Sequence, residues 1–234
     1  MDEGNMGYGG IVWHSDDIIK CEEHLTGYVE KTINSESFRE IFLKDQNLEF
    51  ILYNARNFGL HFHIVTHTKK TSTCQEKADL INFPLERVIK GLIFEDDLEG
   101  NAYVIAVPGT KHKEDIRLKL ADILGIDRNE VAKNRIKLAR KEILPMGIEY
   151  GTVHPILNLE SFGDNNGGVK YILFDKKFKD NRRKERGLDD FSLTLPNYFP
   201  FSNHLVSMQA NYADLFMILH TQYGSERVKA VDLV

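Results

Sequence analysis

The sequence predicts a mixed fold of the α/β (mixed α+β) type, in which strands and helices share one core. Short apolar runs typical of strands, at 88–94 and 102–107, are followed by amphipathic helical patterns at 113–124 and 128–142. No internal repeat or low-complexity tract interrupts this order. With 42% hydrophobic residues, the 234-residue chain has enough apolar side chains for a sizeable core, which excludes global disorder.

Composition narrows the class of protein further. No apolar run approaches the roughly 20 residues that cross a bilayer, and the first residues lack the pattern of a secretory signal. Two cysteines, Cys21 and Cys74, are too few to form the disulfide framework that stabilises a cysteine-rich domain. We therefore predict a cytoplasmic protein without membrane contact. The net charge of −5 argues against a dedicated nucleic-acid coat protein.

The N-terminal part of the chain predicts an extension, 1–46, followed by the main domain, 47–234. The extension holds an apolar patch at 11–13 and a helix at 35–43 that begins after an N-cap serine. Main-domain elements are then predicted in chain order: a helix at 47–57, a strand at 60–65, a helix at 73–80 capped by Thr73, and a hairpin of 88–94 with 102–107.

The C-terminal half predicts helices at 113–124 and 128–142, broken by Gly125. Short strands are predicted at 150–153 and 171–174, and 205–219 mixes strand and helix signals. The polar, glycine-rich stretch 158–168 predicts a loop, and 179–190 is a charged segment expected to be mobile.

Lys90 interrupts an otherwise apolar strand. In an extended 88–94 segment both faces are apolar, so the strand is expected to be buried with a lysine in it. Such an ammonium must snorkel to solvent, pair with an acid or face a polar cavity. The neighbouring Gly91 has no side chain, which allows a ligand or another backbone to approach closely.

A second candidate site is the segment 147–155, with two glycines and a closing proline. Tight loops of this kind expose backbone N–H groups that bind oxyanions and carboxyl groups. An ordinary turn is the alternative interpretation of the same pattern.

Positive charge is concentrated in two stretches. From Lys111 to Lys141 there are ten basic and five acidic residues, and from Lys176 to Gly187 seven basic and two acidic. Both stretches are candidate contacts for phosphate backbones, although runs of charge more often form plain solvated faces.

Several pieces in a fixed order carry a resemblance. They are, in order, the helix at 73–78, the strand Val88–Phe94 with its central lysine, the Tyr103–Gly109 strand with its Ala-Val-Pro, the pair of helices and the loop 151–155. With these elements the chain resembles the YbaK and prolyl-tRNA synthetase-associated editing family. The similarity covers about 58–178. It implies a mixed, mostly antiparallel curved sheet surrounded by helices.

The resemblance implies hydrolysis of the ester that joins a wrong amino acid to the 3′ end of tRNA, without metal, cofactor or covalent nucleophile. A mischarged tRNA is the implied partner, with an aminoacyl-tRNA synthetase as a second one. The implied catalytic set is Lys90, Gly151 and His154. The implied substrate-binding residues are Thr152, Val153, Pro155, His67 and Ser207, and the tRNA-backbone contacts are Lys176, Lys177, Arg182, Arg183 and Lys184.

Three departures from the family pattern bear on activity. Thr152 and His154 are bulky for their places in the loop, which suggests a filter that favours small aminoacyl groups. Where the family has a small Ser-Ala-Gly turn, Ser207-Met208-Gln209 is expected to stand instead. An inactive tRNA- or protein-binding relative is therefore an alternative.

Two other chemistries compete with metal-free ester hydrolysis. His61 and His63, with His67 further along, lie on one face of a strand and suggest a metal-dependent hydrolase. Cys74 at a helix start is a candidate nucleophile. Histidines and cysteines in such places are more often simply packed.

Overall fold

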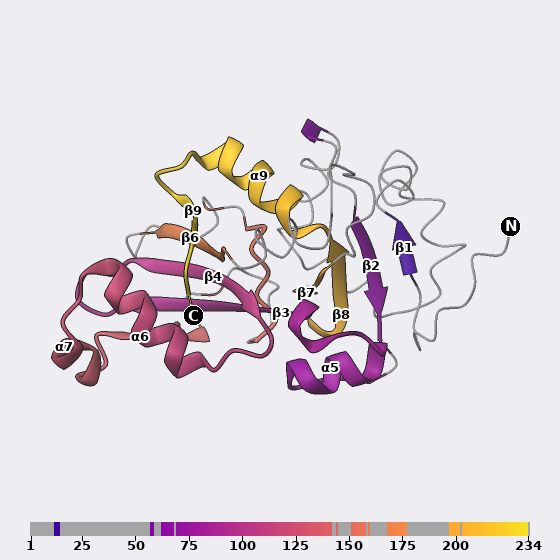
Figure 1. Ribbon diagram of the computed structural model, residues 1–234, viewed down its shortest axis with the longest axis horizontal. Helices are drawn as coiled ribbons and strands as arrows, with labels where there is room; N and C mark the ends of the chain where they lie inside the picture. The colour runs from indigo at the N-terminus through magenta and orange to yellow at the C-terminus, as the bar shows by residue number, and fades with distance from the viewer. Residues whose placement is uncertain are drawn as a thin grey trace, which may run out of the picture.

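The computed structural model describes part of the chain in detail: residues 12–14, 57–58, 62–67, 69–141, 144, 151–157, 159, 168–176, 197–201 and 203–233. Its helices and strands are shown in Figure 1. In chain order they are β1 (Val12–His14), β2 (Phe62–Thr66), α5 (Cys74–Ile81), the 3₁₀ turn η1 (Leu85–Arg87), β3 (Ile89–Asp96), β4 (Ala102–Pro108), α6 (Lys113–Leu124), α7 (Arg128–Ala132), β5 (Ile136–Leu138), β6 (Val169–Asp175), β7 (Asn197–Phe201), β8 (Asn203–Ala210), α9 (Tyr212–Tyr223) and β9 (Val228–Val231).

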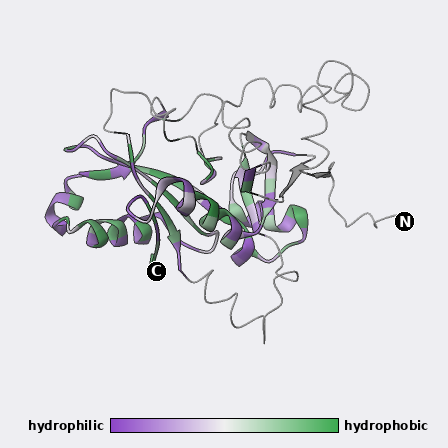
Figure 2. Ribbon diagram, turned by 90° about the horizontal axis from the view of Figure 1, so that it is seen from above, coloured by the Kyte–Doolittle hydropathy of each residue, from purple (hydrophilic) through white to green (hydrophobic). Residues whose placement is uncertain are grey.

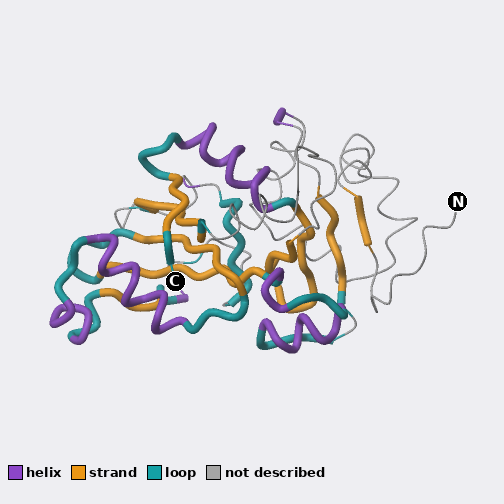
Figure 3. The backbone as a smooth tube through the Cα atoms, viewed as in Figure 1, coloured by secondary structure: helices purple, strands orange, loops and turns teal. Residues whose placement is uncertain are grey.

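The strands form two sheets. One has the order β1-β2-β8-β7 and is antiparallel throughout, and the other has the order β5-β3-β4-β6-β9. In the second sheet β3 pairs antiparallel with β4 and β5, whereas β6 runs parallel to β4 and β9. A parallel bridge between Val88 and Tyr198 joins the sheets. The predicted mixed α+β class is confirmed, with two sheets side by side (Figure 3).

Strand β4 explains why the central run is apolar without alternation. All of its residues are buried, because both faces of the five-stranded sheet are covered. Ile105 and Val107 pack with α6 and α7, while Val104 and Ala106 pack in a second cluster with α9. Figure 2 shows the hydrophobic residues concentrated along these central strands. The predicted hairpin of 88–94 with 102–107 is confirmed as the β3–β4 pair.

Helix α5 begins where its cap predicts. The Thr73 hydroxyl oxygen accepts from the Glu76 N–H, and the Glu76 carboxylate accepts in turn from the Ser72 N–H. This reciprocal arrangement satisfies free N–H groups of the first turn. Helix α6 also has the predicted bounds, and Gly125 ends it in the left-handed region at φ 68°. Among the described helices, none is both long and apolar enough to cross a membrane.

The predicted helix at 128–142 is wrong beyond Ala132. Asn134 takes a positive φ of 61°, which ends the helical path, and Ile136–Leu138 then forms strand β5 beside β3. Ile136 is fully buried in that position, so tertiary packing outweighs the local helical pattern.

Arg135 holds this corner of the sheet together. It donates to both carboxylate oxygens of Asp96, a side chain 1% exposed, and to Glu130. The Asp96 carboxylate also accepts from the Leu98 and Glu99 N–H groups. Although burial opposes ionisation, the bonds from Arg135 and the two amides together hold the pKa of Asp96 below its usual 3.8.

We predict that Arg135→Ala lowers the free energy of unfolding clearly more than Arg128→Ala does. The first substitution leaves a buried carboxylate without its cation, and the second removes an exposed ion pair. Since folding lowers the Asp96 pKa, its stabilising contribution is present at neutral pH and is lost as the pH falls below 3.8. The gap between the two variants should therefore shrink in acid. Urea unfolding at neutral pH and at about pH 3 measures it, and equal losses at neutral pH would contradict the prediction.

Other predicted elements have mixed outcomes. The strand at 171–174 is confirmed within β6, and 205–219 divides into strand β8 and helix α9. The part of the predicted strand 150–153 that is described lies in a loop. Most of the extension, including the helix predicted at 35–43, and the segment 179–190 lie outside the described residues, as does nearly all of 47–57. Within the predicted extension, β1 pairs with β2.

Candidate functional site

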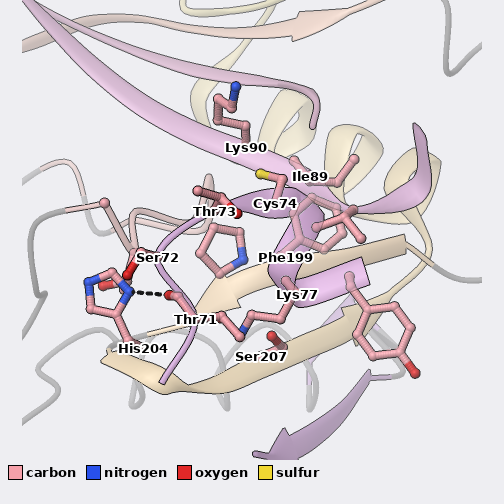
Figure 4. Close-up of a pocket in the computed structure, with 15 residues that line it drawn as sticks. Thr71, Ser72, Thr73, Cys74, Lys77, Ile89, Lys90, Phe199, His204 and Ser207 are labelled. Atoms are coloured by element: carbon pink, nitrogen blue, oxygen red, sulfur yellow. Dashed lines mark hydrogen bonds between the residues drawn. The ribbon is translucent and has the colours of Figure 1, made fainter. Parts of the chain in front are cut away.

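A pocket of about 490 Å³, including open space at its mouth, lies where the two sheets meet. It is lined by the start of α5, the start of β3, strands β7 and β8, and the loop 151–157. Its lining residues are Thr71, Ser72, Thr73, Cys74, Lys77, Val88, Ile89, Lys90, Gly151, Thr152, Tyr198, Phe199, Pro200, His204 and Ser207 (Figure 4). Two of these residues are lysines and none is acidic.

The loop 151–157 lies directly against Gly91. A Cβ atom added to Gly91 would lie 1.7 Å from the Val153 carbonyl oxygen and 2.7 Å from its carbonyl carbon. Only a residue without a side chain permits this contact. The prediction that Gly91 admits close backbone approach is therefore confirmed, and the approaching backbone is that of the candidate loop itself.

Two members of the loop face the pocket. Gly151 is exposed with φ +86°, and Thr152, which is 2% exposed, lines the pocket beside it. Val153 and Pro155 are buried and are absent from the lining, so the structure does not bring these two predicted substrate-binding residues to the pocket. The bulk of Thr152 therefore does lie at the pocket, as the sequence suggested.

Lys90 is half-buried at the edge of the pocket. Its ammonium donates a hydrogen bond to the Lys111 carbonyl, in the turn that follows β4. The lysine in the buried strand is thus held by a backbone acceptor. Lys90 and two residues of the loop, Gly151 and Thr152, line the same pocket.

His67 and Ser207 are also brought together. The His67 Nε2 atom lies 2.9 Å from the Ser207 hydroxyl oxygen, with β2 and β8 paired beside them. Burial, with a contribution from the Lys77 charge, lowers the pKa of His67 to about 3. The imidazole is therefore neutral at physiological pH. So low a pKa makes His67 a weak general base, which favours a positioning role for it.

The structure differs from the prediction at His154. Its ring is fully buried and stacks on Phe201 with centroids 5.3 Å apart, and it is absent from the pocket lining. It therefore does not form a pocket wall, and the size filter predicted from its bulk loses one of its two residues. The cause is the path of the loop, which turns inward after Thr152.

We predict that His154→Ala lowers the free energy of unfolding by about 3 kcal/mol, because it opens a cavity next to Phe201. His154→Phe keeps a ring in the stack and is expected to retain most of that stability. Thermal unfolding of both variants measures the difference. Equal stability of wild type and His154→Ala would show that the stacking contributes little.

The expected turn at Ser207-Met208-Gln209 is also wrong. These residues lie within β8, with Met208 opposite Ile64 on one side and Phe199 on the other. The chain reverses instead between β7 and β8, where Phe201 pairs with Asn203. Strand pairing on both sides leaves no room for a turn at Ser207.

His204 and Lys77 also line the pocket, and the sequence does not single them out. His204 Nδ1 lies 2.9 Å from the Thr71 carbonyl oxygen, and Lys77 projects from α5 one turn after Cys74. The signal that could have found Lys77 is its three-residue spacing from Cys74, which places the two on one face of the helix. No local pattern marks His204.

The geometry of the site gives little support to a metal site at the strand histidines or to a nucleophilic Cys74. In the described part of the chain no three His, Cys, Asp or Glu residues are grouped to hold a metal ion; His63 lies in β2, and His61 is outside that part. Burial raises the pKa of the Cys74 thiol despite Lys90 and Lys77 nearby. The thiol therefore stays protonated, which opposes a nucleophilic role.

Of the residues predicted to contact tRNA phosphates, the structure describes one. Lys176 is exposed at the end of β6 and lies 3.4 Å from the Asp232 carboxylate. Lys177, Arg182, Arg183 and Lys184 are outside the described residues.

Comparison with known proteins shows a shared fold. No family model and no curated protein matches the sequence. Among solved structures, a hypothetical protein has 18% identity and a TM-score of 0.50 over 80% of this chain and 99% of its own. A structure from computational grafting of epitope backbones onto scaffold proteins has 14% identity and a TM-score of 0.51 over 85% of this chain and 97% of its own.

A further structure is that of a "putative trans-editing enzyme for prolyl tRNA synthetase", with 14% identity and a TM-score of 0.49, over 80% of this chain and 98% of its own. Identities this low establish likeness of fold and leave activity to be argued from the site.

Proposed function

We propose that the protein hydrolyses the ester of a mischarged aminoacyl-tRNA. The observation that carries this proposal is the contact of the loop 151–157 with Gly91, which holds Gly151 and Thr152 in the same pocket lining as Lys90, a lining without acidic residues. Such a pocket suits a ligand with negative charge and a carbonyl group. The aminoacylated end of a tRNA has both, and it is the substrate that the family resemblance implies.

Each part of the site has a role in this reaction. Lys90 binds the phosphate next to the terminal ribose through ammonium donors that the Lys111 carbonyl does not use. Backbone N–H groups of the loop stabilise the negative charge that develops on the carbonyl oxygen of the ester. Water attacks the carbonyl carbon with help from a ribose hydroxyl of the substrate, the C–O bond to tRNA breaks, and the ribose oxygen that leaves takes up the proton given by the water. Because the ester is already activated, positioning supplies much of the rate increase.

Deacylation of a panel of mischarged tRNAs tests the proposal. Wild-type protein is expected to release amino acid from at least one of them well above the spontaneous rate. A matched control is Lys70→Met, which removes an exposed lysine from outside the pocket lining and should leave the rate unchanged. Spontaneous rates on every tRNA in the panel would refute the proposal.

One observation favours a second candidate, a tRNA-binding relative without turnover. The Lys90 ammonium donates one hydrogen bond to the Lys111 carbonyl and has two further donors, so it can anchor a phosphate from a fixed position without taking part in a reaction. Tight binding of uncharged and charged tRNA together with spontaneous rates of ester loss would support this alternative.

We predict that the basic segment 176–186 contributes to tRNA affinity. Replacing Arg182, Arg183 and Lys184 by glutamate should weaken binding and flatten its salt dependence, because fewer counterions are released. Binding titrations between roughly 50 and 200 mM salt, the range in which such effects are large, measure the slope. An unchanged slope would assign the segment to plain solvated surface.

A further inference from the structure

Lys77 is a cation without an anionic partner inside the pocket. It projects from the face of α5 that lines the cavity and is half-buried. Within the described part of the chain it makes neither an ion pair nor a hydrogen bond, and the pocket lining contains no aspartate or glutamate. Burial of an unpaired ammonium opposes folding, so its position calls for an explanation in binding.

The groups around Lys77 are neutral. The pKa of His67 is lowered to about 3, and burial keeps the Cys74 thiol protonated. Burial lowers the pKa of Lys77 itself to about 8, so the amine is still mostly charged at neutral pH. An anion entering the pocket would therefore meet a partly desolvated cation with nothing to compete for it. Such a cation binds an anion more strongly than an exposed lysine does.

The two pocket lysines point toward opposite ends of the pocket. In Figure 4 the Lys77 side chain runs toward Thr71 and Ser207, whereas the Lys90 ammonium points away on the other side of Cys74. Thr71 and Ser207, toward which Lys77 runs, are 4% and 1% exposed. A polynucleotide continues past its phosphates and needs an open path, whereas the acyl side chain is a free end. The Lys77 end of the pocket, lined by these buried residues, therefore suits the acyl side chain.

We propose that Lys77 binds a carboxylate on the acyl group, so that the pocket selects an acidic aminoacyl group over its neutral amide. This inference rests on the proposed function and names the substrate class of the same site. Aspartyl is the acidic acyl group we expect, because it has the shorter of the two acidic side chains and Thr152 in the lining takes up more room than a smaller residue would.

Paired substrates of nearly equal shape test the inference. Wild type is expected to hydrolyse aspartyl-tRNA about tenfold or more faster than asparaginyl-tRNA when both carry the same tRNA. Lys77→Met should remove this preference by slowing the aspartyl ester alone, and Lys77→Arg should retain it. The exposed Lys70→Met variant is the control. Thermal unfolding checks that each variant is folded, and Lys77→Met is expected to be at least as stable as wild type.

Two results would overturn the inference. One is equal hydrolysis of the two esters by wild type. The other is an equal loss on both esters in Lys77→Met, which would assign Lys77 to a group common to both substrates, such as a phosphate.

A binding measurement separates this inference from the proposed function. The α-methylamide of N-acetylaspartate, whose one charge is the side-chain carboxylate, is expected to shift the NMR signals of pocket residues in wild type and in Lys77→Arg, and not in Lys77→Met. The α-methylamide of N-acetylasparagine is the neutral probe. If wild type hydrolyses no ester but binds the aspartate probe through Lys77, the proposed function fails and the carboxylate site stands. If neither probe is preferred, the carboxylate site fails whatever the hydrolysis shows.

Discussion

Gly91→Ala is expected to abolish ester hydrolysis and to lower the free energy of unfolding by about 3 kcal/mol or more. The added Cβ would lie 1.7 Å from the Val153 carbonyl oxygen, so the strand and the loop 151–157 cannot keep their present contact. The loop must move as a unit, and Gly151 and Thr152 move with it out of the pocket. Urea unfolding and the deacylation rate measure the two effects.

Gly125→Ala is the matched control for this substitution. It adds the same methyl group where no atom lies within 4 Å, so its only cost is the left-handed φ of 68°. That cost is about 1–2 kcal/mol, and activity should be unchanged. Similar losses in the two variants would show that the contact between Gly91 and Val153 has no special importance.

Lys90→Met is expected to lower the deacylation rate by about 100-fold or more, because it removes the cation that binds the substrate next to the reacting ester. Methionine keeps an apolar stem of similar length in the strand. The lost bond to the Lys111 carbonyl should cost only about 1–2 kcal/mol of stability. Single-turnover rates compared at equal folded fraction measure the effect on the reaction.

Lys90 and Lys77 are expected to differ in which substrates their loss affects. Loss of Lys90 should slow aspartyl and asparaginyl esters alike, since the phosphate is common to both. A wild-type rate in folded Lys90→Met would remove this lysine from the reaction.

The sequence predicted the elements whose local signals agree with their packing. Thr73 and Gly125 bound α5 and α6 through caps that depend on neighbouring residues alone. The β3–β4 hairpin was predictable because its strands are apolar on both faces and adjacent in the chain. The helix at 128–142 was overpredicted, because pairing with β3 pulls Ile136 into the sheet and no local pattern reports that pairing.

The candidate site was predictable to a similar degree. Lys90 stood out as a charge in an apolar strand, and Gly151 as a glycine in a tight loop. Lys77 and His204 did not, because a helix or strand residue faces a pocket only when another element forms the opposite wall. His154 was misplaced for the same reason, since the inward turn of its loop depends on the space beside Phe201.

The bridge between Val88 and Tyr198 gives the pocket a mechanical property. Each of the two residues belongs to the lining, and the bridge joins sheets that otherwise have separate strand ladders in the described part of the chain. The core is shared across this joint, because one buried cluster holds Val104 of the five-stranded sheet together with Phe199 and Met208 of the other sheet. Any change in the width of the mouth must therefore move side chains within that common core. A ligand that contacts both sheets would restrict their relative motion. Its binding is then expected to slow hydrogen exchange of backbone amides most strongly near Val88 and Tyr198.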